Sequence, residues 1–86
     1  MKPLHTKQDV IDLAAANAPT KACLRAMQEQ GWIEVMRLAP GWIVEVWTST
    51  KTWWIGVWVD EEARRYRITY PDALPPGAVR VEGNRL

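Results

Sequence analysis

The sequence predicts an α+β fold, in which two N-terminal helices pack on one face of a four-stranded antiparallel β-meander. The residues before Gly31 are rich in helix formers and carry helix start and stop signals. The residues after it alternate in polarity and are rich in β-branched and aromatic types, with turn-forming segments between the runs. At 86 residues we expect a single domain, 1–86, with helices over 6–30, the meander over 32–70 and a tail or short edge strand over 71–86.

Both helices have recognisable ends. Thr6 followed by Asp9 is a capping box with Asp in place of Glu, and helix formers continue from Lys7 to Asn17. The proline that follows ends this pattern, because it lacks a backbone donor and disfavours helical dihedrals in the residue before it. Either a second helix covers roughly Thr20 to Gln30 or one long helix kinks at the proline. Gly31 suits a left-handed position after the last turn.

The alternating part contains four predicted strands, at about 32–38, 42–48, 53–60 and 65–70. Pro40-Gly41 suits a type II turn, whose twist matches hairpins poorly, so the register of the first two strands stays open. After Pro71, the segment from Val79 to Glu82 is expected to be a short fifth strand or an ordered tail.

Alternation also divides the sheet into two faces. One face is almost entirely aliphatic and is expected to pack against the helices. With 49–52 as the second turn, the other face has these cross-strand pairs: Ile43 with Trp58, Glu45 with Gly56, and Trp47 with Trp54. Closing the next turn over 61–64 places Arg67 across from Trp58, which favours a cation–π contact.

This second face is the predicted contact surface. Six residues are Trp and none is Phe, and the segment from Gly41 to Asp60 is too aromatic on both faces for one core to explain. Trp and Arg are enriched among interface anchors. The residues assigned to partner binding are Trp32, Met36, Ile43, Trp47, Trp54, Trp58, Arg65 and Arg67, joined by Leu38. The alternative is that the tail folds over this face and makes it a second small core.

The remaining chemistry indicates a non-enzymatic protein. No catalytic, metal-binding or phosphate-binding motif is present, His5 lies near the N-terminus, and Cys23 lies on the apolar side of a helix. We therefore expect a protein-binding module without cofactor or metal, used as an inhibitor, adaptor or assembly subunit. Its partner is another protein or a second copy in a homodimer. Without a signal peptide or a membrane-spanning segment, the expected compartment is the cytoplasm.

Nucleic acid is the alternative partner. Single strands stack bases on exposed aromatics, and the Trp face with Arg65 and Arg67 offers both stacking and charge. The segment from Leu13 to Val35 also resembles the recognition helix and first wing strand of winged-helix DNA-binding proteins, which implies DNA binding. Its basic residues are only Lys21 and Arg25, however, and 11 basic against 10 acidic residues give a net charge of +1. Such a balance provides no general attraction to phosphates.

Overall fold

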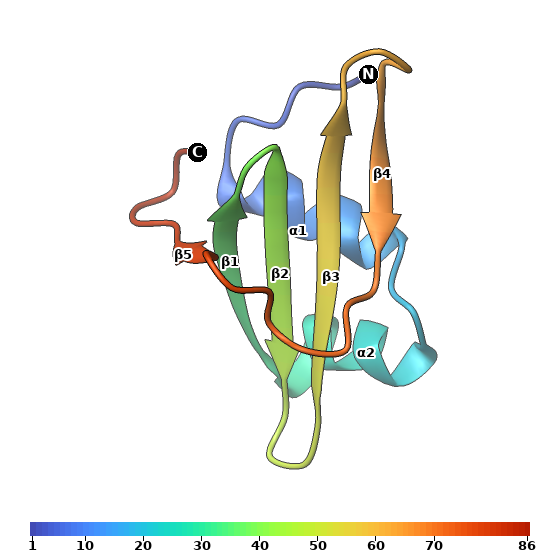
Figure 1. Ribbon diagram of the computed structural model, residues 1–86. Helices are drawn as coiled ribbons and strands as arrows, with labels where there is room; N and C mark the ends of the chain where they lie inside the picture. The colour runs from blue at the N-terminus through green and yellow to red at the C-terminus, as the bar shows by residue number, and fades with distance from the viewer.

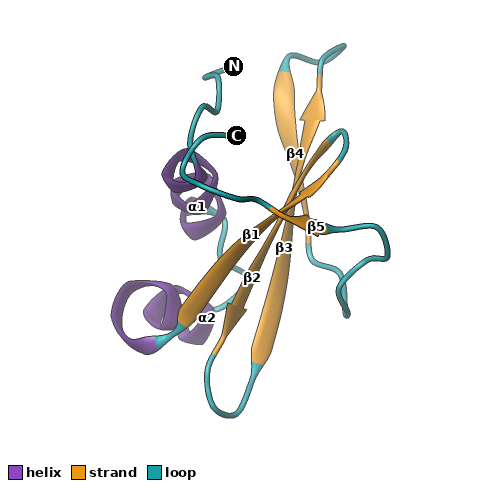
Figure 2. Ribbon diagram, turned by 90° about the vertical axis from the view of Figure 1, so that its left-hand side faces the viewer, coloured by secondary structure: helices purple, strands orange, loops and turns teal.

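The computed structural model describes all 86 residues, apart from the side chain of Gln30, and has a helical layer on one side of a sheet (Figures 1 and 2). The sheet is antiparallel, with five strands in the order β4-β3-β2-β1-β5. The α+β meander is therefore confirmed, including the fifth strand. The elements are α1 (Lys7–Ala16), α2 (Lys21–Arg25), the π-helical turn η1 (Ala26–Gln30), β1 (Trp32–Leu38), β2 (Gly41–Trp47), β3 (Thr52–Asp60), β4 (Arg65–Thr69) and β5 (Val79–Arg80).

Helix α1 begins where its capping box predicts. The Thr6 hydroxyl accepts from the Asp9 amide at 3.1 Å, and the Asp9 carboxylate accepts from the Thr6 amide at 3.0 Å. The amide of His5 donates to the same carboxylate, and these backbone bonds hold the pKa of Asp9 below its ordinary value. Two donors that the helix leaves free are thus satisfied locally.

The second helical segment ends differently from the prediction. Thr20 caps its start by accepting from the Cys23 amide at 3.0 Å, but the last turn is a π-turn, closed by a bond from the Gly31 amide to the Ala26 carbonyl at 2.8 Å. Gly31 has φ −83°, so the predicted left-handed conformation is wrong. Glycine is needed here for space, because a Cβ would lie 2.6 Å from the Ala26 carbonyl oxygen.

The helix-covered face is the main core. Val44 and Val46 of β2 and Ile55 and Val57 of β3 are fully buried there. The buried helical residues of the same cluster are Val10, Ala14, Cys23 and Ala26. The aliphatic face predicted from alternation is confirmed.

Register is confirmed at one hairpin and corrected at another. Trp58 lies across from Arg67, as predicted. The open register of β1 and β2 runs from Trp32↔Trp47 to Leu38↔Gly41. Between β2 and β3 the prediction is wrong, because the observed pairs are Ile43↔Gly56, Glu45↔Trp54 and Trp47↔Thr52.

The cause of this shift is the position of the turn between β2 and β3. The Thr48 hydroxyl accepts from the amides of Thr50 at 3.3 Å and Lys51 at 3.2 Å, and the Thr48 amide donates to the Lys51 carbonyl at 2.8 Å. The turn therefore covers 48–51 and not 49–52. Because pairing moves by an even number of residues, every side chain stays on its predicted face.

The tail, 71–86, crosses the face opposite the helices before β5 joins β1 (Figures 1 and 2). Arg80 donates to Glu34 at 2.7 Å, and the Val81 amide donates to the Val35 carbonyl at 3.0 Å. The Leu86 amide then reaches the His5 carbonyl at 3.1 Å. The tail is thus tied to the sheet and to the segment that precedes α1.

Candidate interaction surface

The predicted contact surface is not one continuous exposed patch. Its centre, beside the crossing tail, contains Ile43, which is fully buried, and Met36, which is 7% exposed. Leu38 is half-buried. The expectation of a continuous patch is therefore wrong, and the alternative of a second small core holds for the centre of this face. At this centre β5 joins β1 opposite Met36, and the Trp58 indole lies over Gly56, the cross-strand partner of Ile43.

Trp58 is also oriented differently from the prediction. Its indole nitrogen donates to the Thr69 hydroxyl at 2.6 Å and lies over Gly56, where a Cβ would come within 2.6 Å of it. Arg67 is across the ladder and exposed, as is Arg65. The cation–π contacts found among the described residues are Arg37 on Trp42 at 4.6 Å and Lys51 on Trp53 at 5.4 Å. The expected contact between Arg67 and Trp58 is not formed, because the indole turns toward Thr69.

The sheet narrows to three strands at one end, the lower end in Figure 1. Pairing of β3 with β4 stops at Gly56↔Thr69, whereas β1, β2 and β3 stay paired as far as Trp32, Trp47 and Thr52. Pro71 explains the stop, because proline has no amide to continue the ladder. We call residues 32–34, 45–47 and 52–54 the three-stranded end.

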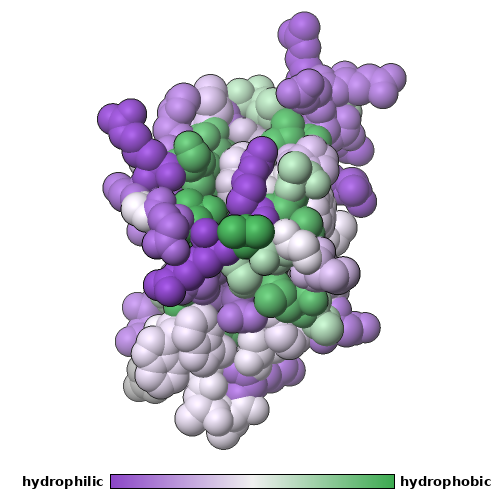
Figure 3. Space-filling model, turned by 60° about the vertical axis from the view of Figure 1, so that its left-hand side comes forward, coloured by the Kyte–Doolittle hydropathy of each residue, from purple (hydrophilic) through white to green (hydrophobic). Residues whose placement is uncertain are grey.

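Four tryptophans gather at the three-stranded end: Trp32, Trp47, Trp53 and Trp54. Trp32 is 56% exposed, and its ring stacks on Trp47 with centroids 6.2 Å apart and planes inclined by 21°. Trp54 donates from its indole nitrogen to Glu45 at 2.7 Å. In Figure 3 the lower end of this side is pale, the colour of residues of intermediate hydropathy. The end is therefore an aromatic surface whose rings are held in place.

Among the described residues, no three His, Cys, Asp or Glu side chains are grouped so that they could hold a metal ion. Burial raises the pKa of the Cys23 thiol to about 11, which keeps it protonated at neutral pH. No helix in the described chain combines the length and apolar character needed to cross a membrane.

Comparison of the chain with known protein families, curated proteins and solved structures finds no match. The function of the surface has to be inferred from its own geometry.

Sequence reasoning missed three residues at this end. Lys51, Trp53 and Tyr70 were not assigned to a site, although all three border the place where β4 stops. The signal was present in the predicted strand lengths, because a fourth strand over 65–70 is too short to cover a third strand over 53–60 in the register that the structure confirms. The unpaired residues of the longer strand were therefore predictable.

Proposed function

We propose that the protein is a non-catalytic protein-binding module that uses the three-stranded end as its contact surface. The observation that carries the proposal is the stacked pair of Trp32 and Trp47, because Trp32 leaves 56% of its surface exposed. Exposed aromatic anchors concentrate binding energy. A ring that is already fixed by stacking also loses little conformational entropy when a partner covers it.

Charge favours a protein partner over nucleic acid. Glu34 and Glu45 lie directly across from each other between β1 and β2, beside the Trp32–Trp47 pair. Arg65 and Arg67 lie on β4, which does not extend to the three-stranded end. Bases stacked on Trp32 and Trp47 would bring phosphates toward these carboxylates, because Lys51 and Arg25 lie beside Trp53, on the helix-covered side of the sheet. The partner is therefore another protein or a second copy of the chain, as for an inhibitor, an adaptor or a subunit of an assembly.

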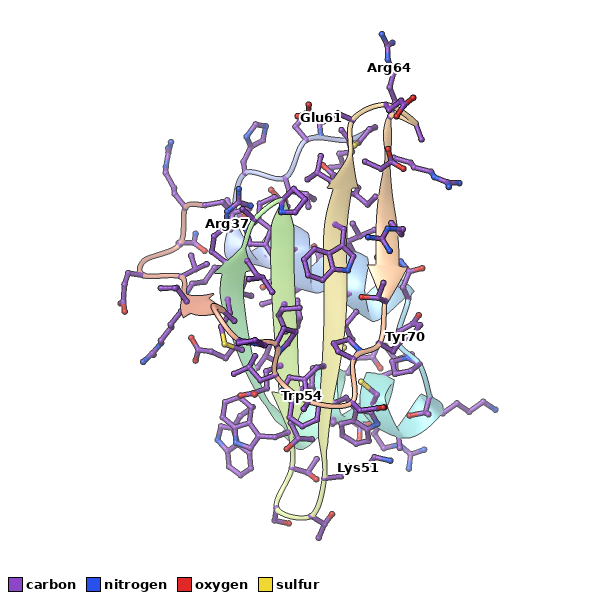
Figure 4. All side chains as sticks on the ribbon, viewed as in Figure 1. Arg37, Lys51, Trp54, Glu61, Arg64 and Tyr70 are labelled. Carbon is purple, nitrogen blue, oxygen red and sulfur yellow. The ribbon has the colours of Figure 1, made fainter. Side chains whose placement is uncertain are left out.

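Selection of binders tests the proposal. Sedimentation velocity of the wild-type protein over a range of concentrations reports self-association first. A random dodecapeptide library is then selected on immobilised protein, and the affinities of enriched peptides are measured for Trp32→Ala. We expect a loss of about 30-fold, which corresponds to a hot-spot residue. Arg64→Ala, at the opposite end of the molecule in Figure 4, is the control and should leave affinity within about twofold.

Tryptophan fluorescence distinguishes a protein partner from a nucleic-acid partner. The proposal predicts no change in emission when mixed-sequence single strands are added at low or high salt. Binding that falls steeply with salt and weakens in Arg67→Ala would contradict it and identify a nucleic-acid-binding face. Peptides that bind the wild type and Trp32→Ala equally well would show that the stacked pair is not the anchor.

A further inference from the structure

Strand β3 extends beyond its neighbour on one side. On the β4 side its last partnered residue is Gly56, which pairs with Thr69, and Tyr70, Pro71 and Asp72 leave the ladder but line a hollow beside β3. On the β2 side pairing continues to Thr52. The stretch Thr52–Trp54 is therefore a strand edge beyond the end of β4.

The backbone groups of this edge point outward. The Val59 amide donates to the Pro40 carbonyl at 3.1 Å, so odd-numbered residues of β3 bond toward β2. In an antiparallel sheet, successive residues direct their amide and carbonyl groups to opposite sides. Thr52 and Trp54 therefore present their amides and carbonyls away from β2, on the side that β4 leaves open. An added strand needs donors and acceptors in this arrangement.

A hollow of about 230 Å³ lies along this edge. Its aromatic walls come from both faces of the sheet, Trp53 from the helix side and Trp54 from the outer side, with Tyr70 beyond the end of β4. Tyr70 is 49% exposed and is fixed by a bond from its hydroxyl to the Asn17 carbonyl at 2.6 Å. Figure 4 shows Trp54, Tyr70 and Lys51 around the lower part of β3. The hollow can take apolar side chains of a segment paired with β3.

Positive charge marks the hairpin end of the hollow. Lys51 lines it and also lines an adjoining hollow of about 320 Å³, where Arg25 of α2 is a second cation. The carboxylate among the lining residues is Asp72, in the tail. Lys51 is exposed and lies over the Trp53 ring at 5.4 Å. An acidic side chain of a partner therefore finds two cations at this end.

From the open edge, the aromatic hollow and the two cations, we propose that β3 takes up an extended acidic segment of a partner protein. The segment pairs with Thr52 and Trp54 as an added strand, and its Asp or Glu side chain contacts Lys51 and Arg25. This inference rests on the proposed function and specifies how the partner is held.

The rest of the same sheet edge is unsuited to such pairing. Arg65 and Arg67 are exposed on β4, and exposed charges protect strand edges from association. A symmetric pairing of β4 with β4 of a second copy would bring these arginines close together. The edge at Thr52–Trp54 has no charged residue of its own. The occupant is therefore a partner segment at β3.

The test uses peptides enriched from a random dodecapeptide library on the wild-type protein. We expect each to carry Asp or Glu within a run of β-branched or aromatic residues. Lys51→Glu should weaken their binding by about tenfold or more, because it reverses the charge that meets the carboxylate. Thr52→Pro removes one outward amide and should have a similar effect, whereas Thr52→Val retains that amide and should stay within about threefold of wild type.

Each outcome decides the inference. If enriched peptides bind Lys51→Glu and Thr52→Pro as tightly as wild type, the strand-addition inference is overturned. If the same peptides do not bind Trp32→Ala, the proposed function still stands. If peptides do not bind Thr52→Pro but bind Trp32→Ala with wild-type affinity, the result supports strand addition and contradicts the role of the stacked pair. A library without enriched peptides overturns both.

Hydrogen exchange keeps the test decisive should Thr52→Pro not fold. Binding of an enriched peptide to the wild type should slow exchange of the Thr52 and Trp54 amides by about tenfold or more. The inference is overturned if peptide binding leaves the exchange of both amides unchanged. It is also overturned if, without peptide, exchange at these amides becomes slower as the protein concentration rises. The second result would identify a second copy of the chain as the occupant.

Discussion

The two faces of the sheet are shielded from solvent in different ways. On the helix-covered face, the indole nitrogens of Trp42 and Trp53 are buried without a hydrogen-bond partner among the described residues. On the outer face, Trp54 donates to Glu45 and Trp58 donates to Thr69. The helices cover their face mainly by apolar packing, and these two buried polar groups have no partner there. The outer face, crossed only by the tail, depends on directed polar bonds as well.

This difference explains where the molecule is open. A helix covers a broad strip of sheet, whereas the tail covers only the strip that it crosses. Ile43 in the middle of the outer face is fully buried, whereas Trp32 at its end is 56% exposed. The candidate interaction surface lies at this end, where Pro71 and Asp72 of the tail share a hollow with Trp54 but Trp32 stays exposed.

The largest expected effect tests whether the centre of the outer face is a true core. Ile43 is fully buried, so Ile43→Ala should lower the free energy of unfolding by about 2–4 kcal/mol through loss of packing. A denaturant titration measures it. The control is Leu74→Ala, at a tail residue that is 41% exposed and should change stability little. Equal, small losses would show that the tail leaves this centre open.

Val57 provides the reference for the helix-covered face. It is fully buried, and Val57→Ala should cost about 1–3 kcal/mol. Thr50→Ala, in the exposed turn between β2 and β3, should cost far less in the same titration. If the two substitutions had equal effects, the assignment of Val57 to the core would be contradicted.

A smaller effect tests the polar bonds of the outer face. Thr69→Val keeps the shape of the side chain but removes the acceptor that lies 2.6 Å from the Trp58 nitrogen. We expect a loss of about 0.5–1.5 kcal/mol in the free energy of unfolding. Thr69→Ser retains the hydroxyl and should recover most of it. A Val variant as stable as wild type would show that this bond does not hold the face together.

A further effect, which appears only at high pH, concerns Cys23 under the helices. Burial raises the pKa of its thiol from 9.0 to about 11, so the unfolded chain loses this proton first. Stability should therefore fall as pH rises from about 9 to 11. Cys23→Ala should remove that part of the dependence, as seen in denaturant midpoints across this range. Identical slopes for both proteins would contradict a buried thiol.

The fold was largely predictable because its signals are local. Alternation places each strand residue on a face, and the Thr6 capping box sets the start of α1. The register of β2 and β3 was not predictable, since the polar run from Thr48 to Thr52 permits two neighbouring four-residue turns. Which one forms depends on the bonds that the Thr48 hydroxyl makes in the folded turn.

The candidate site was predictable only in part. The sequence places Trp32 and Ile43 on the same face, but it shows neither the path of the tail across that face nor that Ile43 is buried and Trp32 exposed. That path has no periodic pattern to reveal it, because the segment 71–78 is rich in proline and forms no strand. It follows from contacts between distant parts of the chain, such as the ion pair of Arg80 with Glu34.

Residue-resolved hydrogen exchange of the free protein tests the open three-stranded end most directly. Gly56 and Trp58 of β3 face β4, whereas Thr52 and Trp54 of the same strand lie beyond its end. We predict that the amides of Thr52 and Trp54 exchange at least about 100-fold faster than those of Gly56 and Trp58 in dilute monomeric protein. Equal protection of all four amides would contradict an open edge at this end of the sheet.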